Sequence, residues 1–142
     1  MDDQDPAPGT PARLAIVDDH AGVLAALTQM LGGLDDIAVV GLALDGEHAI
    51  RLCRLTRPDV VLMDLSMPRL DGVEATRRIL AERPGTRVVV ITSASDGRVE
   101  QAMEAGAVSS VFKHDPNEAI VEAVRAAAAM RGSAVRGVPS TQ

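Results

Sequence analysis

The run Val60-Val61-Leu62-Met63-Asp64 constrains the fold of this chain more than any other stretch. Its four apolar residues, two of them β-branched, predict a strand buried on both faces, and the run ends abruptly on a carboxylate. Pro58 precedes the run, while Pro68 and Gly72 punctuate the segment after it. Such strands are typical of parallel sheets, whose ligands bind beyond the carboxyl ends of the strands. Asp64 is therefore a candidate site residue.

The rest of the chain alternates short apolar runs with segments of helical spacing. Four further strands are predicted, over Arg13–Val17, Ile37–Leu44, Arg87–Ile91 and Val108–Phe112. Five helices are predicted. The first covers 20–31, the second runs from Asp45-Gly46 to before Pro58, and the third covers 72–81 after a capping box of Asp71 and Glu74. The fourth runs from a cap at Asp96 to Gly106, and the fifth runs from a cap at Asp115 to about Met130. Five strands that alternate with five helices predict an α/β fold with a doubly wound parallel sheet.

Composition excludes several classes of protein. At 142 residues with 46% hydrophobic content, the chain is one domain with a proper core. A formal charge of -6 and scattered arginines argue against a nucleic-acid partner for this chain, and Phe112 is its only aromatic residue. No apolar run approaches a membrane span of about 18 residues, and the acidic N-terminus is unlike a secretory signal. The lone Cys53, read as a core residue, fits a reducing compartment, so we expect a cytoplasmic protein.

Polar residues follow four of the five predicted strands. Asp18 and Asp19 follow the first strand, Asp64 ends the third, Thr92 follows the fourth, and Lys113 follows the fifth. The carboxyl ends of parallel strands lie at one edge of a sheet, so these side chains should converge there. Three clustered carboxylates either raise one another's pKa values or demand a counter-cation, and oxygen-rich sites of this kind suit Mg²⁺. A carboxylate nucleophile with a hard cation, a lysine and a hydroxyl is suited to forming an aspartyl phosphate.

In these features the chain resembles the receiver domain of two-component response regulators. The matching motifs are Val17-Asp18-Asp19, Asp64-Leu65-Ser66-Met67-Pro68 with Asp71-Gly72, Ile91-Thr92-Ser93, Gly106-Ala107 and Lys113. Asp18-Asp19-His20 is also similar to the opening of the NarL/FixJ-type subgroup. The resemblance implies a flavodoxin-like five-stranded sheet in the order 2-1-3-4-5. The resemblance covers the chain from about Arg13 to Met130, so 12–131 are expected to form the receiver domain. The composition of 1–11 predicts a flexible tail, and 132–142 are expected to be a C-terminal tail or a truncated linker.

The resemblance implies a metal site at the acidic edge. Asp19 would bind Mg²⁺ directly and Asp18 chiefly through water. Asp64 and the backbone carbonyl of Ser66 would complete the protein ligands. Because Mg²⁺ is not a histidine metal, His20 near this edge is expected in a supporting or exposed position.

The same resemblance assigns the phosphoryl chemistry and the switch. Asp64 would be the phosphoacceptor and would take a phosphoryl group from a sensor histidine kinase. Lys113 would pair with the acceptor and then with the phosphoryl group, and Thr92 would swing inward to hydrogen-bond it. The family's aromatic switch position is Ser110 in this chain, and Phe112, two residues later, would share its face of the strand. Ordinary packing is the favoured interpretation of Phe112, with a substitute switch as its alternative.

Partners and competing functions complete the expectations. The resemblance implies a signalling domain rather than an enzyme with turnover. It also implies a candidate homodimer through the fourth helix, fifth strand and fifth helix. DNA would be bound only through an output domain not present in these residues. Ser110 motivates an alternative, an interaction module that works without phosphorylation. A Mg²⁺-dependent hydrolase is a weaker alternative, because Ser66 stands where a second catalytic acid would be needed.

Overall fold

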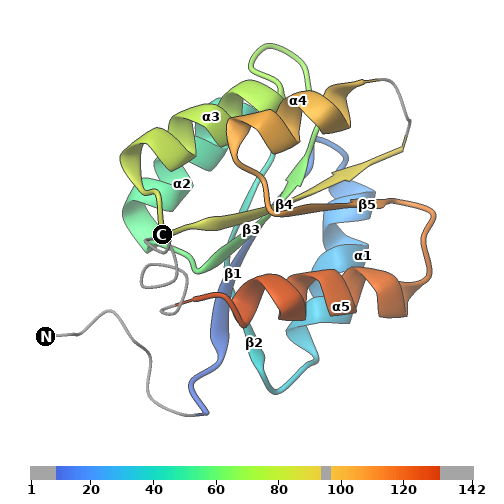
Figure 1. Ribbon diagram of the computed structural model, residues 1–142. Coiled ribbons are helices and arrows are strands. Elements are labelled where there is room, and N and C mark those ends of the chain that lie inside the picture. Colours follow the sequence, from blue (N-terminus) through green and yellow to red (C-terminus); the bar gives the residue numbers. More distant parts are fainter. Residues whose placement is uncertain (1–8, 94–96, 132–142) are drawn as a thin grey trace, which may run out of the picture.

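The structure is a computed structural model that describes residues 9–93 and 97–131. Within these ranges the chain forms five strands that alternate with five helices (Figure 1). The elements are β1 (Ala12–Val17), α1 (Ala21–Gly32), β2 (Ile37–Ala43), α2 (Gly46–Thr56), β3 (Val60–Asp64), α3 (Gly72–Glu82), β4 (Arg87–Thr92), α4 (Arg98–Ala105), β5 (Ser109–Phe112) and α5 (Asn117–Ala128). The predicted tail 132–142 and residues 1–8 of the predicted tail 1–11 lie outside the described residues.

The five strands are parallel and pair in the order β2-β1-β3-β4-β5, which confirms the predicted topology. β3 lies at the centre, and all five of its residues are buried. Its register pairs Met63 with Val17 of β1 and Asp64 with Ile91 of β4. Because the strands are in step, their carboxyl ends lie at one edge of the sheet.

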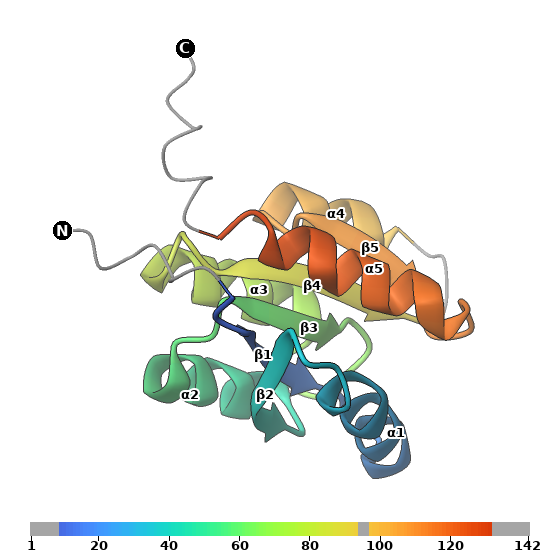
Figure 2. The ribbon, with the colours of Figure 1, turned by 90° about the horizontal axis from the view of Figure 1, so that it is seen from below.

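Helices cover both faces of the sheet (Figures 1 and 2). One core cluster joins one face of the strands to α2, α3 and α4, and the second cluster joins the other face to α1 and α5. Cys53 of α2 is buried in the first cluster, as predicted, and burial raises the pKa of its thiol to about 11. Within the described residues, no helix has the length and apolar character needed to cross a membrane.

Two of the predicted helix caps differ from the observed ones. Asp71 accepts a hydrogen bond from the Glu74 backbone N–H at 3.0 Å, but the Glu74 carboxylate accepts from Arg77 and Arg78 instead of completing a capping box. The cap predicted at Asp115 is wrong. Its carboxylate accepts from the Phe112 backbone N–H at 2.8 Å, and α5 begins one residue later than expected.

The cap predicted at Asp96 lies outside the described residues, since the structure resumes at Gly97, the residue before α4. At the other end of this helix the prediction is confirmed. Gly106 follows α4 with a φ of 117°, and its backbone N–H bonds to carbonyls of the last turn. Only glycine adopts this left-handed conformation without strain, so the helix ends where the sequence indicates.

Two glycines allow the loop after β3 to pack closely. A Cβ at Gly72 would lie 2.2 Å from the backbone oxygen of Asp64, and a Cβ at Gly46 would lie 2.4 Å from that of Leu70. No side chain fits at such separations, so the first residues of α2 and α3 must be glycine for this loop to keep its course. The position of Asp64 therefore depends on residues that carry no chemistry of their own.

We predict that Gly72→Ala destabilises the fold by more than about 1 kcal/mol, because the backbone at Asp64 must move to admit the methyl group. Gly85→Ala is the matched control, since a Cβ there has no atom within 4 Å. Urea unfolding of both variants measures the difference. Equal stability of the two variants would contradict the close approach at Gly72.

Candidate functional site

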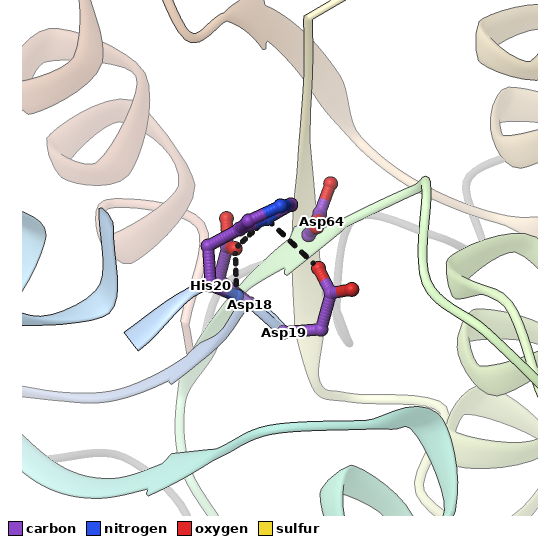
Figure 3. A group of neighbouring side chains, drawn as sticks. All are labelled: Asp18, Asp19, His20 and Asp64. Carbon is purple, nitrogen blue, oxygen red and sulfur yellow. Dashed lines mark hydrogen bonds and ion pairs between the residues drawn. The ribbon is translucent and has the colours of Figure 1, made fainter. Parts of the chain in front are cut away.

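The carboxyl edge of the sheet gathers the residues that the sequence singled out. Asp18 and Asp19 directly follow β1, Asp64 and Thr92 are the last residues of β3 and β4, and Lys113 directly follows β5. Figure 3 shows the three carboxylates converging from two adjacent strands, with His20 beside them. One ligand atom from each of these four residues lies within 4.8 Å of all the others. The predicted convergence of the three carboxylates is confirmed.

Backbone amides orient two of the carboxylates. Asp18 accepts a hydrogen bond from the His20 N–H at 2.9 Å through Oδ1, and Asp64 accepts from the Ser66 N–H at 3.2 Å through Oδ1. In both cases the donor lies two residues further along the chain, in the loop that follows the strand. Each carboxylate therefore has one oxygen fixed by its own loop and presents the other, Oδ2, to the site.

Lys113 carries the positive charge of this edge. Its Nζ lies 2.8 Å from Asp18 Oδ2 and 3.5 Å from Asp64 Oδ2. Burial by itself would lower the pKa of the ammonium group, but the hydrogen bond with Asp18 and the negative charges of Asp64 and Asp18 outweigh that effect and raise it. Lys113 is therefore a permanent cation at neutral pH, held between two carboxylates.

The ionised form of Asp64 is destabilised by its surroundings. It has no exposed surface, and burial raises its pKa to about 6, with the charge of Asp18 adding to the shift and Lys113 opposing it. One ammonium group thus compensates incompletely for the neighbouring acids. Additional positive charge at this site would stabilise the ionised form of Asp64.

The oxygens at this edge fit a hard divalent cation. Asp19 Oδ1 and Asp64 Oδ2 are buried atoms without a hydrogen-bond donor in the described part of the chain, and the partner of the buried Asp18 Oδ2 is the Lys113 ammonium at 2.8 Å. Buried carboxylate oxygens that lack donors are costly unless a cation satisfies them, and Lys113 contacts two of the three as an ion pair. The donor set is entirely oxygen, which suits Mg²⁺.

The residues expected to relay a signal lie on β4 and β5. Thr92 is buried, while Ser110 is exposed and pairs in the sheet with Val90, whose side chain belongs to the core beneath α2, α3 and α4. Phe112 is half-buried and stacks on His114, with ring centroids 5.2 Å apart and planes 21° from parallel. The aromatic ring nearest Ser110 along the strand is thus partnered by a neighbour in sequence.

Sequence reasoning missed Arg98, the first residue of α4. Its Nη1 donates to the backbone carbonyl of Leu65 at 2.9 Å, and the same nitrogen lies 3.9 Å from Asp71 Oδ2. Leu65 follows Asp64 directly, so this contact joins α4 to the loop that carries the candidate nucleophile. An arginine at the start of a helix has no distinguishing sequence pattern, and the contact spans 33 residues of chain.

The sheet order and the acidic carboxyl edge place this chain among the flavodoxin-like α/β domains. The chain belongs to the response regulator receiver domain family, whose family model matches residues 14–125. It is accordingly a receiver domain of two-component signalling rather than a classical enzyme.

Relatives agree with this assignment. The chain is 40% identical to the transcriptional regulatory protein LiaR of Bacillus subtilis over 81% of its length, and 40% identical to the response regulator GacA of Pseudomonas aeruginosa over 80%. These matches cover 55% and 53% of the relatives, so the chain spans about half the length of the curated proteins it matches.

Solved structures give the same result. A LuxR-family response regulator from Aurantimonas sp. superposes with a TM-score of 0.81 at 36% identity, covering 86% of this chain and 88% of that one. The signal receiver domain of the putative response regulator NarL from Mycobacterium tuberculosis also has a TM-score of 0.81, at 31% identity, with 86% and 99% of the two chains covered. The predicted resemblance to NarL/FixJ-type receivers is confirmed.

The cost of the buried charge at Asp64 predicts that Asp64→Asn stabilises the protein in the absence of divalent cations. The pKa of Asp64 in the folded state, about 6, exceeds the ordinary value of 3.8. Ionisation of Asp64 therefore lowers the free energy of unfolding as pH rises from about 4 to 6, and the loss is complete at higher pH. At pH 7.5 in EDTA we expect the variant to be about 1–3 kcal/mol more stable in urea unfolding.

This advantage should shrink as pH falls toward 4, because the wild-type carboxyl group is then protonated in the folded state and increasingly so in the unfolded state. Asp36→Asn is the control, since Asp36 lies in an exposed ion pair with Arg125 at 2.8 Å and its pKa is lowered chiefly by that hydrogen bond. Its removal should be neutral or slightly destabilising. A stabilisation by Asp64→Asn that does not change with pH would contradict the charge argument.

Proposed function

We propose that this chain accepts a phosphoryl group on Asp64 from the phosphohistidine of a sensor kinase and then changes the surface that it offers to partners. The observation that carries the proposal is the Oδ2 atom of Asp64. It is buried, accepts no hydrogen bond from the described residues, and lies 3.5 Å from the Lys113 ammonium at the carboxyl edge of the sheet. A carboxylate oxygen held in this way is available as a nucleophile.

The transfer is an in-line displacement at phosphorus. Asp64 Oδ2 forms the new P–O bond, the P–N bond to the donor imidazole breaks, and the imidazole nitrogen keeps the electron pair and takes up a proton. Lys113 offsets the negative charge on the phosphoryl oxygens, and the Thr92 hydroxyl donates to one of them. Hydrolysis of the resulting acyl phosphate by water returns the carboxylate and limits the lifetime of the signal.

Mg²⁺ fits the same residues and would be held by Asp18, Asp19, Asp64 and the backbone carbonyl of Ser66. When bound, the ion would neutralise part of the charge that gathers on the phosphoryl oxygens. The chain's own contribution is to aim the carboxylates. The Ser66 amide fixes Oδ1 of Asp64 and leaves Oδ2 for the ion, while the His20 amide and the Lys113 ammonium hold the two oxygens of Asp18.

The partners of the whole protein follow from the family. We propose a sensor histidine kinase as donor, residues 12–131 as the receiving unit, and homodimerisation through α4, β5 and α5 as the output. DNA would be bound only by an output domain beyond these residues, consistent with relatives about twice as long as the matched region. The acidic composition of this chain argues against binding to phosphate backbones by these residues themselves.

An interaction module that works without phosphorylation remains the second candidate. The exposed Ser110 favours it, because the residue at that position has no aromatic ring to move inward when Thr92 moves. Under this alternative, Asp64→Ala and Thr92→Ala would leave partner affinity unchanged whether or not a phosphodonor is present. Under the leading proposal, both variants abolish the phosphodonor-dependent change in affinity.

The direct test is to incubate the protein with Mg²⁺ and acetyl phosphate and to measure its intact mass. We expect wild-type protein to gain one phosphoryl group and Asp64→Ala to gain none. Asp36→Asn, which removes an exposed carboxylate from another part of the surface, should behave as wild type. A wild-type chain without the mass gain, or an Asp64→Ala chain with it, would overturn the proposal.

Removing the Lys113 ammonium should slow phosphorylation while Asp64 remains the residue that is phosphorylated. We expect Lys113→Ala to reduce the initial rate of phosphorylation by about 10²–10³-fold, in the range for loss of one charge-stabilising group. Thr92→Ala should reduce it less, and Thr92→Ser should restore the wild-type rate because it keeps the hydroxyl. Circular dichroism establishes that each variant is folded, and an unchanged rate in Lys113→Ala would contradict its assigned role.

A further inference from the structure

Arg98, the first residue of α4, holds one peptide of the loop that follows Asp64. Its Nη1 donates to the Leu65 carbonyl at 2.9 Å, across 33 residues of chain. The same carbonyl accepts the Gly72 N–H at 3.2 Å, which closes the loop between β3 and α3. The Gly72 bond is internal to this loop, whereas α4 lies alongside α3 as a separate element (Figure 1). Arg98 therefore fixes the carbonyl to a part of the fold outside the loop.

The Leu65 carbonyl and the Ser66 N–H belong to the same peptide group. That group is planar and trans, so its C=O and N–H point in opposite directions and turn together. The Ser66 N–H donates to Asp64 Oδ1 at 3.2 Å. A rotation of this peptide that broke the Arg98 bond would also turn the donor away from Asp64. The guanidinium and the carboxylate thus hold the two ends of one rigid unit.

The positive charge of Arg98 strengthens this arrangement. A charged donor polarises the peptide whose carbonyl it contacts, and the N–H of that peptide becomes a better donor. The bond is partly buried, because Leu65 itself has no exposed surface. The other contact of Arg98 with this loop, 3.9 Å to Asp71 Oδ2, is too long for a hydrogen bond. The Leu65 carbonyl is therefore the contact through which Arg98 acts on the loop.

We propose that Arg98 is a positioning residue for the Asp64 carboxylate and acts through the peptide between Leu65 and Ser66. With Oδ1 held by the Ser66 N–H, Oδ2 of Asp64 faces the Lys113 ammonium at 3.5 Å. Loss of the guanidinium frees the peptide to turn, so the carboxylate presents Oδ2 to the site for a smaller fraction of the time. The consequence for phosphoryl transfer rests on the proposed function, because the rate of such a transfer depends steeply on the orientation of the nucleophile.

Four variants separate this role from a structural one. Arg98→Met keeps the length and apolar stem of the side chain and removes the donor and the charge, whereas Arg98→Lys keeps a charged donor of nearly the same reach. Asp71→Asn removes the charge of the more distant partner and keeps the Oδ1 atom that accepts the Glu74 N–H. Arg77→Met is the matched control, because Arg77 is an exposed arginine that pairs with Glu74 within α3 at 2.7 Å.

The first readout is the exchange of the Ser66 amide proton with solvent, followed by NMR on metal-free protein. We expect exchange about threefold or more faster in Arg98→Met, as for the weakening of one hydrogen bond, and exchange close to wild type in Arg98→Lys. The Glu74 amide, at the other end of the loop, is the internal reference and should change by less than about twofold in both variants. Asp71→Asn and Arg77→Met should leave the exchange of Ser66 unchanged.

The second readout is the initial rate of phosphorylation by acetyl phosphate with Mg²⁺. We expect Arg98→Met to lower this rate by about tenfold and Arg98→Lys to restore it to within about threefold of wild type. Asp71→Asn and Arg77→Met should react at the wild-type rate. Circular dichroism and urea unfolding establish that each variant is folded, and the rescue by lysine distinguishes the lost donor from a general loss of stability.

The inference is overturned if Ser66 exchange is unchanged in Arg98→Met, or if the Ser66 and Glu74 amides accelerate equally, because the loop has then loosened as a whole. It is equally overturned if Asp71→Asn reproduces both effects, or if exchange rises while the rate of phosphorylation stays the same. Failure of wild-type protein to gain a phosphoryl group contradicts the proposed function instead. The exchange measurements need neither Mg²⁺ nor a phosphodonor and still decide whether Arg98 orients the Ser66 amide.

Discussion

The structure depends on an incomplete charge balance at the carboxyl edge of the sheet. Asp18 and Asp64 are held side by side without exposed surface, and Lys113 contacts both at 2.8 and 3.5 Å. A single ammonium group cannot compensate for two buried carboxylates and a third beside them, which is why burial raises the pKa of Asp64 to about 6. The edge therefore favours any added positive charge, and the proposed phosphoryl transfer uses this property.

Under the proposed function, a change at Asp64 has to reach the surface without an aromatic ring at the position of Ser110. Ser110 is exposed and carries no ring, and Phe112 is stacked on His114. Arg98 offers a direct mechanical link, because its guanidinium holds the Leu65 carbonyl, one residue from Asp64, while its backbone begins α4. Movement of the loop after β3 would thus displace α4, which belongs to the face proposed for dimerisation.

The sequence predicts the strands and their functional ends well because both follow from one-dimensional patterns. Val60–Asp64 is apolar enough to be buried on both faces, and parallel pairing then places Asp64 beside Asp18. The failures concern polar side chains with several partners within reach. Asp115 bonds the amide of Phe112 rather than capping α5, and Glu74 pairs with two arginines. Such choices depend on three-dimensional competition, as does the Arg98 contact across 33 residues.

The opposite, amino edge of the sheet is built differently from the carboxyl edge. There, Asp59 accepts from the Arg13 backbone at 2.9 Å and from Arg131 at 3.4 Å, while the Arg13 guanidinium closes the end of α2 through the Thr56 and Arg57 carbonyls. Arg131, just after α5, also donates to the Thr10 carbonyl. These contacts join the chain across the amino edge, although the buried Arg87 Nε there has no hydrogen-bond partner among the described residues. At the carboxyl edge it is carboxylate oxygens, those of Asp19 and Asp64, that lack donors. Under the proposed function, the lateral helices offer the shorter route for a change at Asp64, because Arg98 joins the loop after β3 to α4 while the amino edge lies at the far end of the strands.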